Sequence, residues 1–210
     1  MTKPSEQRWE ARLFAVGSIC FAVAAVPGFA SLVGATADNA TYFIGSICFT
    51  TASFTQWMLT GRRKGRAWRS PAWSDWWSAA IQFPGTLFFN VSTFSALVGG
   101  SDVWRPDALG SVCFLVSSIM AMRATVVRDQ ILWDPTSRTW ETAWLNLIGS
   151  VAFGVSAIAA YTVPSSGEVV NVALVNLGTF VGALCFLGGA LLMTPDPARV
   201  PAPAAGGSAA

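Results

Sequence analysis

Six long apolar runs constrain this chain more than any other feature of its sequence. They cover residues 12–34, 41–60, 75–98, 104–122, 141–163 and 168–193. Each can cross the ~30 Å hydrocarbon core of a bilayer as a helix. Backbone groups inside lipid must be hydrogen-bonded within the protein, which runs of this length achieve as helices rather than strands. The sequence therefore predicts an all-α polytopic membrane protein, with six transmembrane helices within residues 1–194 and a disordered tail over 195–210.

The composition supports this class and excludes several functions. Only 11% of the residues are charged, against ~25% in a typical soluble domain. The absence of histidine removes the usual proton shuttle and excludes Ser-His-Asp and Cys-His sites. The four cysteines fit no zinc spacing, and a net charge of +2 gives no basic field for nucleic acid. We therefore expect no enzymatic activity, no cofactor or metal, and no nucleic-acid partner.

The basic residues predict the orientation. All of them except Arg105 fall at the N-terminus, in the loops after the second and fourth runs, or in the tail. Because positive charge stays on the cytoplasmic side, we expect both termini in the cytoplasm of a cell whose inner membrane holds the protein. One loop carries a cluster of five: Arg62, Arg63, Lys64, Arg66 and Arg69. Topology alone explains the cluster, and contact with anionic lipid head groups is the alternative.

Two helix starts have recognisable signals. Ser74 followed by Asp75 predicts an N-cap for the third helix. The segment from Ser165 to Glu168 predicts a capping box for the sixth.

A short repeat recurs in every run: a glycine is followed four residues later by a phenylalanine. The pairs are Gly17 and Phe21, Gly45 and Phe49, Gly85 and Phe89, Gly110 and Phe114, Gly149 and Phe153, and Gly182 and Phe186. All four cysteines stand three residues after such a glycine. The pattern predicts three copies of a two-helix hairpin, at 8–60, 74–122 and 139–193, related by an axis along the membrane normal.

On a helix, the residue three before the glycine lies on the same face as the glycine and the phenylalanine. These residues are Phe14, Tyr42, Gln82, Asp107, Asn146 and Thr179. One interpretation of this stripe is a helix-packing seam, because glycine lets a neighbouring backbone approach. The other is a polar crevice along a pseudo-threefold axis. The GxxxG of Gly178 and Gly182 adds a face on which a homo-oligomer is expected to form.

Five polar residues inside the runs are candidate site residues. Gln82, Asn90, Asn146 and Asn176 predict either interhelical hydrogen bonds or the lining of a solute pathway. Asp107 follows Pro106 in a first helical turn, where an acid complements the helix dipole. The alternative for Asp107 is a proton or cation relay, because acids within a membrane are often functional.

Some of these segments resemble a known family. The stretches 8–18 and 41–47, with their shared Gly-Ser steps, resemble the YrhK-like domain, a small bacterial two-helix membrane module, and 105–111 is similar to its second helix. The resemblance covers the first 120 residues well and the third hairpin weakly. It implies a bacterial inner membrane and no chemistry, because the family has no established activity.

Two functions follow as hypotheses. The first is a structural or interaction protein of the inner membrane, which a uniform packing seam and the lack of catalytic residues favour. The alternative is a transporter or channel for a small solute, which the repeat and the in-span amides favour. A hydrated cavity on the repeat face separates them.

Overall fold

The computed structural model describes residues 4–61 and 67–193, and these form an all-α protein. The helices are α1 (Pro4–Ala24), α2 (Phe29–Val33), α3 (Ala35–Gly61), α4 (Pro71–Leu97), α5 (Trp104–Asp129), α6 (Arg138–Ala159) and α7 (Val172–Met193). The only pairing of extended backbone in these residues is one antiparallel bridge between Thr162 and Val169. The expected fold class, all-α, is confirmed. The expected tail at 195–210 and four residues of the basic cluster, Arg62 to Arg66, lie outside the described residues.

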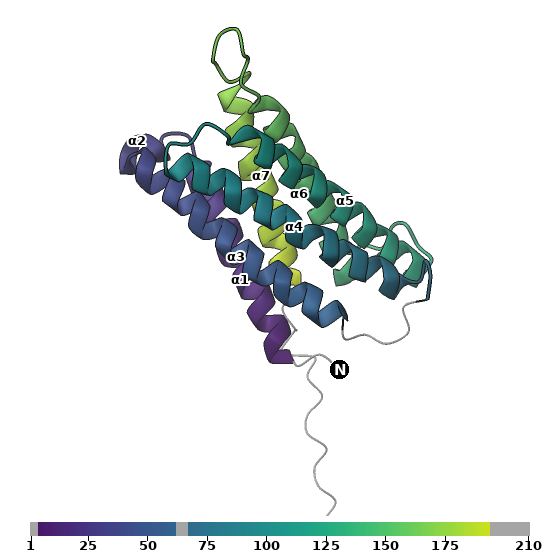
Figure 1. Ribbon diagram of the computed structural model, residues 1–210. Coiled ribbons are helices and arrows are strands. Elements are labelled where there is room, and N and C mark those ends of the chain that lie inside the picture. The colour runs from purple at the N-terminus through teal and green to yellow at the C-terminus, as the bar shows by residue number, and fades with distance from the viewer. Residues whose placement is uncertain (1–3, 62–66, 194–210) are drawn as a thin grey trace, which may run out of the picture.

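The six long helices form a closed ring in chain order. Each packs against the next, and α7 packs back onto α1; within the described residues, the backbones of long helices that are not neighbours in this order do not come close to one another. Figure 1 shows the N-terminus at one end of the bundle, with α2 and the α6–α7 loop at the other. We refer to these as the proximal and distal ends. The ring leaves its interior axis to be filled by side chains.

Three helices, α5, α6 and α7, are long and apolar enough to cross a membrane by themselves. This finding fits a membrane protein. Helices α1, α3 and α4 are 21, 27 and 27 residues long, but in the described residues they fall short of the same apolar criterion. They carry more polar side chains, of which Thr50 and Asn90 bond to each other between α3 and α4.

The first apolar run is not one helix. Helix α1 begins earlier than expected, at Pro4, and ends at Ala24, and the short α2 follows before α3 begins at Ala35. The break has a local cause, because Pro27 cannot donate the helical hydrogen bond and Gly28 adopts a left-handed φ of 91°. The prediction of a single span over 12–34 was therefore wrong beyond Ala24.

The start of α4 also differs from the prediction. Ser70 is the N-cap, since its side chain accepts a hydrogen bond from the backbone N–H of Trp73 at 3.1 Å. Pro71 follows at the first helical position, where its missing N–H costs nothing. Ser74, the expected cap, is buried in the first turns of the helix.

The last helix starts later than its predicted capping box. Ser166 accepts a hydrogen bond from the N–H of Glu168, but within the turn that precedes the helix. Asn171 performs the capping instead, because its Oδ1 accepts from the N–H of Leu174 at 2.9 Å. Asparagine is among the best N-cap residues, so the true signal was one residue before Val172.

Glycine sets the distance between the two helices of each hairpin. A Cβ added to Gly45 would lie 2.8 Å from the Cβ of Cys20 and 3.1 Å from the carbonyl oxygen of Gly17. The same crossing recurs at Gly85 with Gly110 and at Gly149 with Gly182, where each glycine faces the backbone oxygen of its partner. Any side chain at these positions would push the two backbones apart.

This contact predicts the effect of a single methyl group. Gly45→Ala should destabilise the protein in detergent by about 1–3 kcal/mol, because the added carbon overpacks the crossing. Thermal unfolding followed by circular dichroism measures the change. Gly154→Ala is the matched control, since Gly154 lies inside α6 with nothing within 4 Å of its added Cβ. The control should be neutral or stabilised by up to about 1 kcal/mol through helix propensity. Equal losses in the two variants would contradict the close approach.

Candidate functional site

The centre of the ring is filled by the six phenylalanines of the repeat. Phe21, Phe89 and Phe153 come from α1, α4 and α6, which are not neighbours, yet their ring centroids lie 6.0–6.5 Å apart in all three pairs. Phe49, Phe114 and Phe186 come from α3, α5 and α7 and form a second triangle, with centroids 5.6–6.4 Å apart. Three-way contact among alternate helices is only achieved at the axis of the ring.

The two triangles are joined within each hairpin. Centroids are 5.5 Å apart for Phe21 and Phe49, 5.1 Å for Phe89 and Phe114, and 5.3 Å for Phe153 and Phe186. All six side chains are buried. Most of the pairs are edge-to-face or tilted, the arrangements that the aromatic quadrupole favours. We refer to these six residues as the phenylalanine plug, because together they close the axis of the ring.

A cavity of about 550 Å³ lies on the distal side of the plug. All six long helices contribute to its wall, and Phe21, Phe89 and Phe153 form its floor. Tyr42 and Asp107 line it from α3 and α5. The cavity continues up to the loops of the distal end, and its size is typical of a small-molecule site.

A second cavity, of about 580 Å³, lies at the proximal end. It too is lined by all six long helices. Its wall carries both signs of charge: Glu10 and Asp75 are accompanied by Arg128 and Arg138. The plug therefore separates two cavities that share the interior of one ring.

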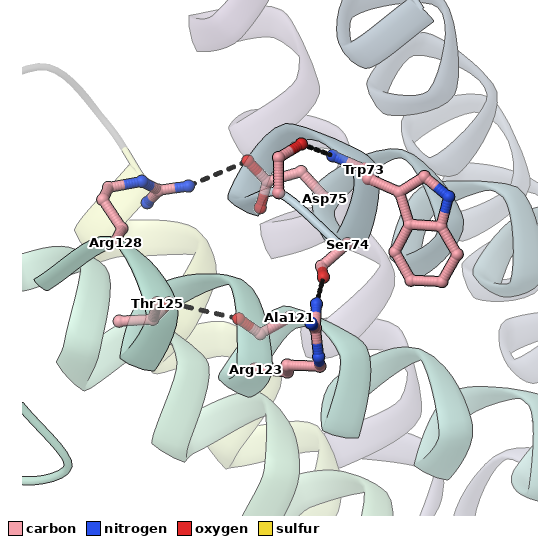
Figure 2. A network of polar contacts seen from close by, with 8 residues as sticks. Trp73, Ser74, Asp75, Ala121, Arg123, Thr125 and Arg128 are labelled. Atoms are coloured by element: carbon pink, nitrogen blue, oxygen red, sulfur yellow. Dashed lines mark hydrogen bonds and ion pairs between the residues drawn. The ribbon is translucent and has the colours of Figure 1, made fainter. Parts of the chain in front are cut away.

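The charges at the rim of the proximal cavity are paired (Figure 2). Arg128 of α5 forms an ion pair with Asp75 of α4 at 2.8 Å. Five residues earlier on α5, Arg123 donates to Ser74, and Figure 2 shows this bond beside the ion pair. The Arg123 guanidinium also lies 5.8 Å from the ring centroid of Trp73. These contacts fasten α5 to the start of α4 and neutralise part of the charge there.

Hydroxyl pairs join helices around the plug. Ser46 bonds Thr93 at 3.0 Å between α3 and α4, and Ser118 bonds Ser150 at 2.7 Å between α5 and α6. The two pairs occupy equivalent positions in the repeat. In each pair, one residue directly follows a repeat glycine, and the other stands eight residues after the repeat glycine of the facing helix. Such pairs satisfy polar groups between helices where water is excluded.

Two of the candidate amides make interhelical hydrogen bonds. Gln82 donates to Ser53 at 3.4 Å and accepts from Ser117 at 3.2 Å. Asn90 donates to Thr50 at 2.9 Å, whereas its Oδ1 has no partner among the described residues. Neither amide lines one of the two cavities.

The other three candidates line cavities. Asn146 faces the proximal cavity, and Asn176 and Asp107 face the distal one. Asp107 lies in the first turn of α5, as the dipole interpretation requires. However, α5 has no side-chain capping bond at its N-terminus, so Asp107 does not act as a hydrogen-bonding cap.

Sequence reasoning missed two members of the distal wall, Asp38 and Tyr42, as site residues. The register of the repeat contained the signal for Tyr42, because Tyr42, Asp107 and Thr179 all stand three residues before a repeat glycine on helices that begin at the distal end. All three line the distal cavity. Asp38 carries no such signal, since it stands one turn before that register.

Two further sequence interpretations change with the structure. The GxxxG glycines Gly178 and Gly182 face α6 of the same chain, against Ala152 and Gly149, so this face is not free for a second copy. The four cysteines are half-buried rather than buried. None of them lines either cavity.

Comparison with known proteins identifies part of the ring. Residues 90–165 match the YrhK-like protein family. The chain contains a YrhK-like region. The suspected family is thus confirmed, but the matched region runs from the second half of α4 through α5 and α6 instead of covering the first 120 residues. No curated protein and no solved structure matches the chain. The YrhK-like region supplies α5, α6 and the C-terminal end of α4, with the plug residues Phe114 and Phe153, and its family has no established activity.

The two cavities make a prediction about hydration. In a variant whose native cysteines are replaced by alanine, Asn176→Cys should react with a membrane-impermeant maleimide in membrane fragments open on both sides, because Asn176 lines the distal cavity. In the native chain Cys48 and Cys113 should remain unlabelled. Gel-shift detection of the adduct measures both. An unreactive Asn176→Cys, or labelled native thiols, would contradict this assignment.

Proposed function

We propose that the protein crosses a bacterial inner membrane six times and forms a gated pathway for a small solute. The observation that carries the proposal is the stack of cavity, phenylalanine plug and cavity inside one closed ring. A protein that serves only as a packing partner has no need of two cavities on its axis. The geometry therefore favours a transporter or channel over the structural role that the sequence also allowed.

The side chains around the plug support a pathway that opens. Six rings with no hydrogen bonds among them can change rotamer without breaking polar contacts, and an apolar constriction excludes water when it is closed. The hydroxyl pairs lie between helices, so they hold the ring together while the axis changes. Alternating exposure of the two cavities would then move a solute past the plug.

Six membrane crossings are supported by the outer surface of the ring. Helices α1, α3 and α4 expose large apolar side chains just as α5, α6 and α7 do; Ile19, Ile47 and Val91 are 44–52% exposed. Many of their polar residues, such as Ser46, Ser53 and Thr86, are fully buried inside the ring, which lowers the average hydropathy without placing those groups in lipid. A ring with half of its helices in water would expose these apolar faces.

Three equivalent hairpins are supported by the recurrence of one crossing. Each hairpin contributes two facing glycines and two plug phenylalanines at matching positions. Helices that cross alike and converge on one axis are what a pseudo-threefold repeat would produce.

The orientation is tested by fusions in the loops. We expect a reporter active only in the periplasm to work after Asp102, at the distal end, and to be silent after Thr136, at the proximal end. The reason is that the arginines of the described residues, other than Arg105, gather toward the proximal end. Activity after Thr136 would reverse the topology.

The gate is tested by enlarging the axis. The double variant Phe89→Ala/Phe114→Ala removes two plug rings in contact at 5.1 Å. Reconstituted in liposomes, it should release trapped radiolabelled glycerol and choline several-fold faster than the unaltered protein, because the constriction is opened. The control is Phe54→Ala/Phe94→Ala, which removes two half-exposed rings from the outside of α3 and α4.

The competing structural role predicts a different result for the same variants. If the plug only packs, its loss lowers thermal stability and leaves efflux equal to that of the control. Equal efflux from folded, monodisperse samples would overturn the pathway.

A further inference from the structure

Two acids line the distal cavity without any base beside them. Asp38 and Asp107 both line it, and no lysine or arginine does. Arg105, two residues from Asp107, is exposed, does not line the cavity and forms no ion pair with Asp107 among the described residues. The proximal cavity differs, because its acids share the wall with Arg128 and Arg138.

Asp107 is placed where an unbalanced charge is costly. Its side chain is partly buried and lines the cavity. Within the described chain its carboxylate makes no hydrogen bond and no ion pair. The Oδ1 of Asp38 is likewise buried without a partner. Unpaired buried carboxylates are strongly unfavourable, so a cation in the cavity would relieve both.

The remaining wall of the cavity is aromatic. Tyr42 and Trp104 line its sides, and Phe21, Phe89 and Phe153 form its floor. Trp104 is held in place, because its Nε1 donates to the carbonyl oxygen of Ala157 at 2.8 Å. The faces of such rings attract cations within about 6 Å. The attraction is most effective for cations that water hydrates weakly, such as alkylammonium ions.

We propose that the distal cavity binds a small alkylammonium ion, with Asp107 as its counter-ion and the aromatic wall around its alkyl groups. This inference rests on the proposed function and names the solute class of that pathway. A metal ion fits less well, because the described residues hold no group of three or more potential metal-ligating side chains, and aromatic faces cannot replace a hydration shell of oxygen ligands.

Binding is measured on the purified full-length protein by isothermal titration calorimetry with choline. We expect saturable binding that Asp107→Asn weakens about tenfold or more, because a desolvated ion pair is lost. Asp107→Glu, which keeps the charge, should retain most of the affinity. Asp102→Asn is the matched control, since it makes the same change at an exposed acid at the same end that does not line the cavity. Asp38→Asn provides a second test if Asp107→Asn fails to fold.

The ligand also has a matched control. The uncharged carbon isostere of choline, 3,3-dimethylbutan-1-ol, should bind far more weakly than choline. Sodium ions at a concentration comparable to that of choline should not displace it. The proposal would be overturned by any one of four results: no saturable binding of choline, equal binding of the isostere, displacement of choline by sodium, or equal effects of Asp102→Asn and Asp107→Asn. Failure of the pathway is distinguishable: choline would then bind with the same pattern while the plug variants release no solute.

Discussion

The close approach of helices at glycine is the contact on which the rest of this structure depends. Where Gly17 meets Gly45, the two backbones are separated by less than any side chain requires. The phenylalanine one turn further on each helix is thereby carried to the axis of the ring. A wider crossing would move all six rings apart, and the two triangles of the plug would lose contact.

The ring reverses the usual distribution of polar groups in a soluble protein. Its exterior is formed by isoleucine, valine and leucine, whereas hydroxyls such as Ser46, Thr86 and Ser150 are fully buried. In lipid this arrangement is favourable, because a buried hydroxyl finds a partner on a neighbouring helix while the apolar surface remains in hydrocarbon. The same arrangement explains why the average hydropathy of α3 and α4 is too low for a typical membrane span, although both helices expose large apolar side chains. Average hydropathy does not distinguish a polar group that faces lipid from one that faces the interior.

The sequence predicted the helices and their shared stripe, because length and a four-residue spacing are local properties. It left open whether the stripe was a seam or a crevice, and the structure contains both: Gly45 lies in a seam, and Asp107, on the equivalent stripe of α5, lines a cavity. That distinction depends on which helices meet at the axis, which no local spacing encodes. The ends of helices were predicted least well. Ser70 and Asn171 cap α4 and α7. In both cases the prediction had chosen nearby polar residues, Ser74 with Asp75 and the segment from Ser165 to Glu168, instead.

The ring is not uniform at the interface where it closes. Between α3 and α4, and between α5 and α6, a serine next to a repeat glycine finds a hydroxyl on the facing helix. Between α1 and α7 the corresponding serine is Ser18, whose buried Oγ has no partner among the described residues. The residue in the matching register of α7 is Ala190, which has no hydroxyl. Helices α1 and α7 are also the two neighbours in the ring that no loop connects. Unlike the α3–α4 and α5–α6 interfaces, the α1–α7 interface therefore has neither a connecting loop nor this hydroxyl pair. Apolar packing contributes more of its stability.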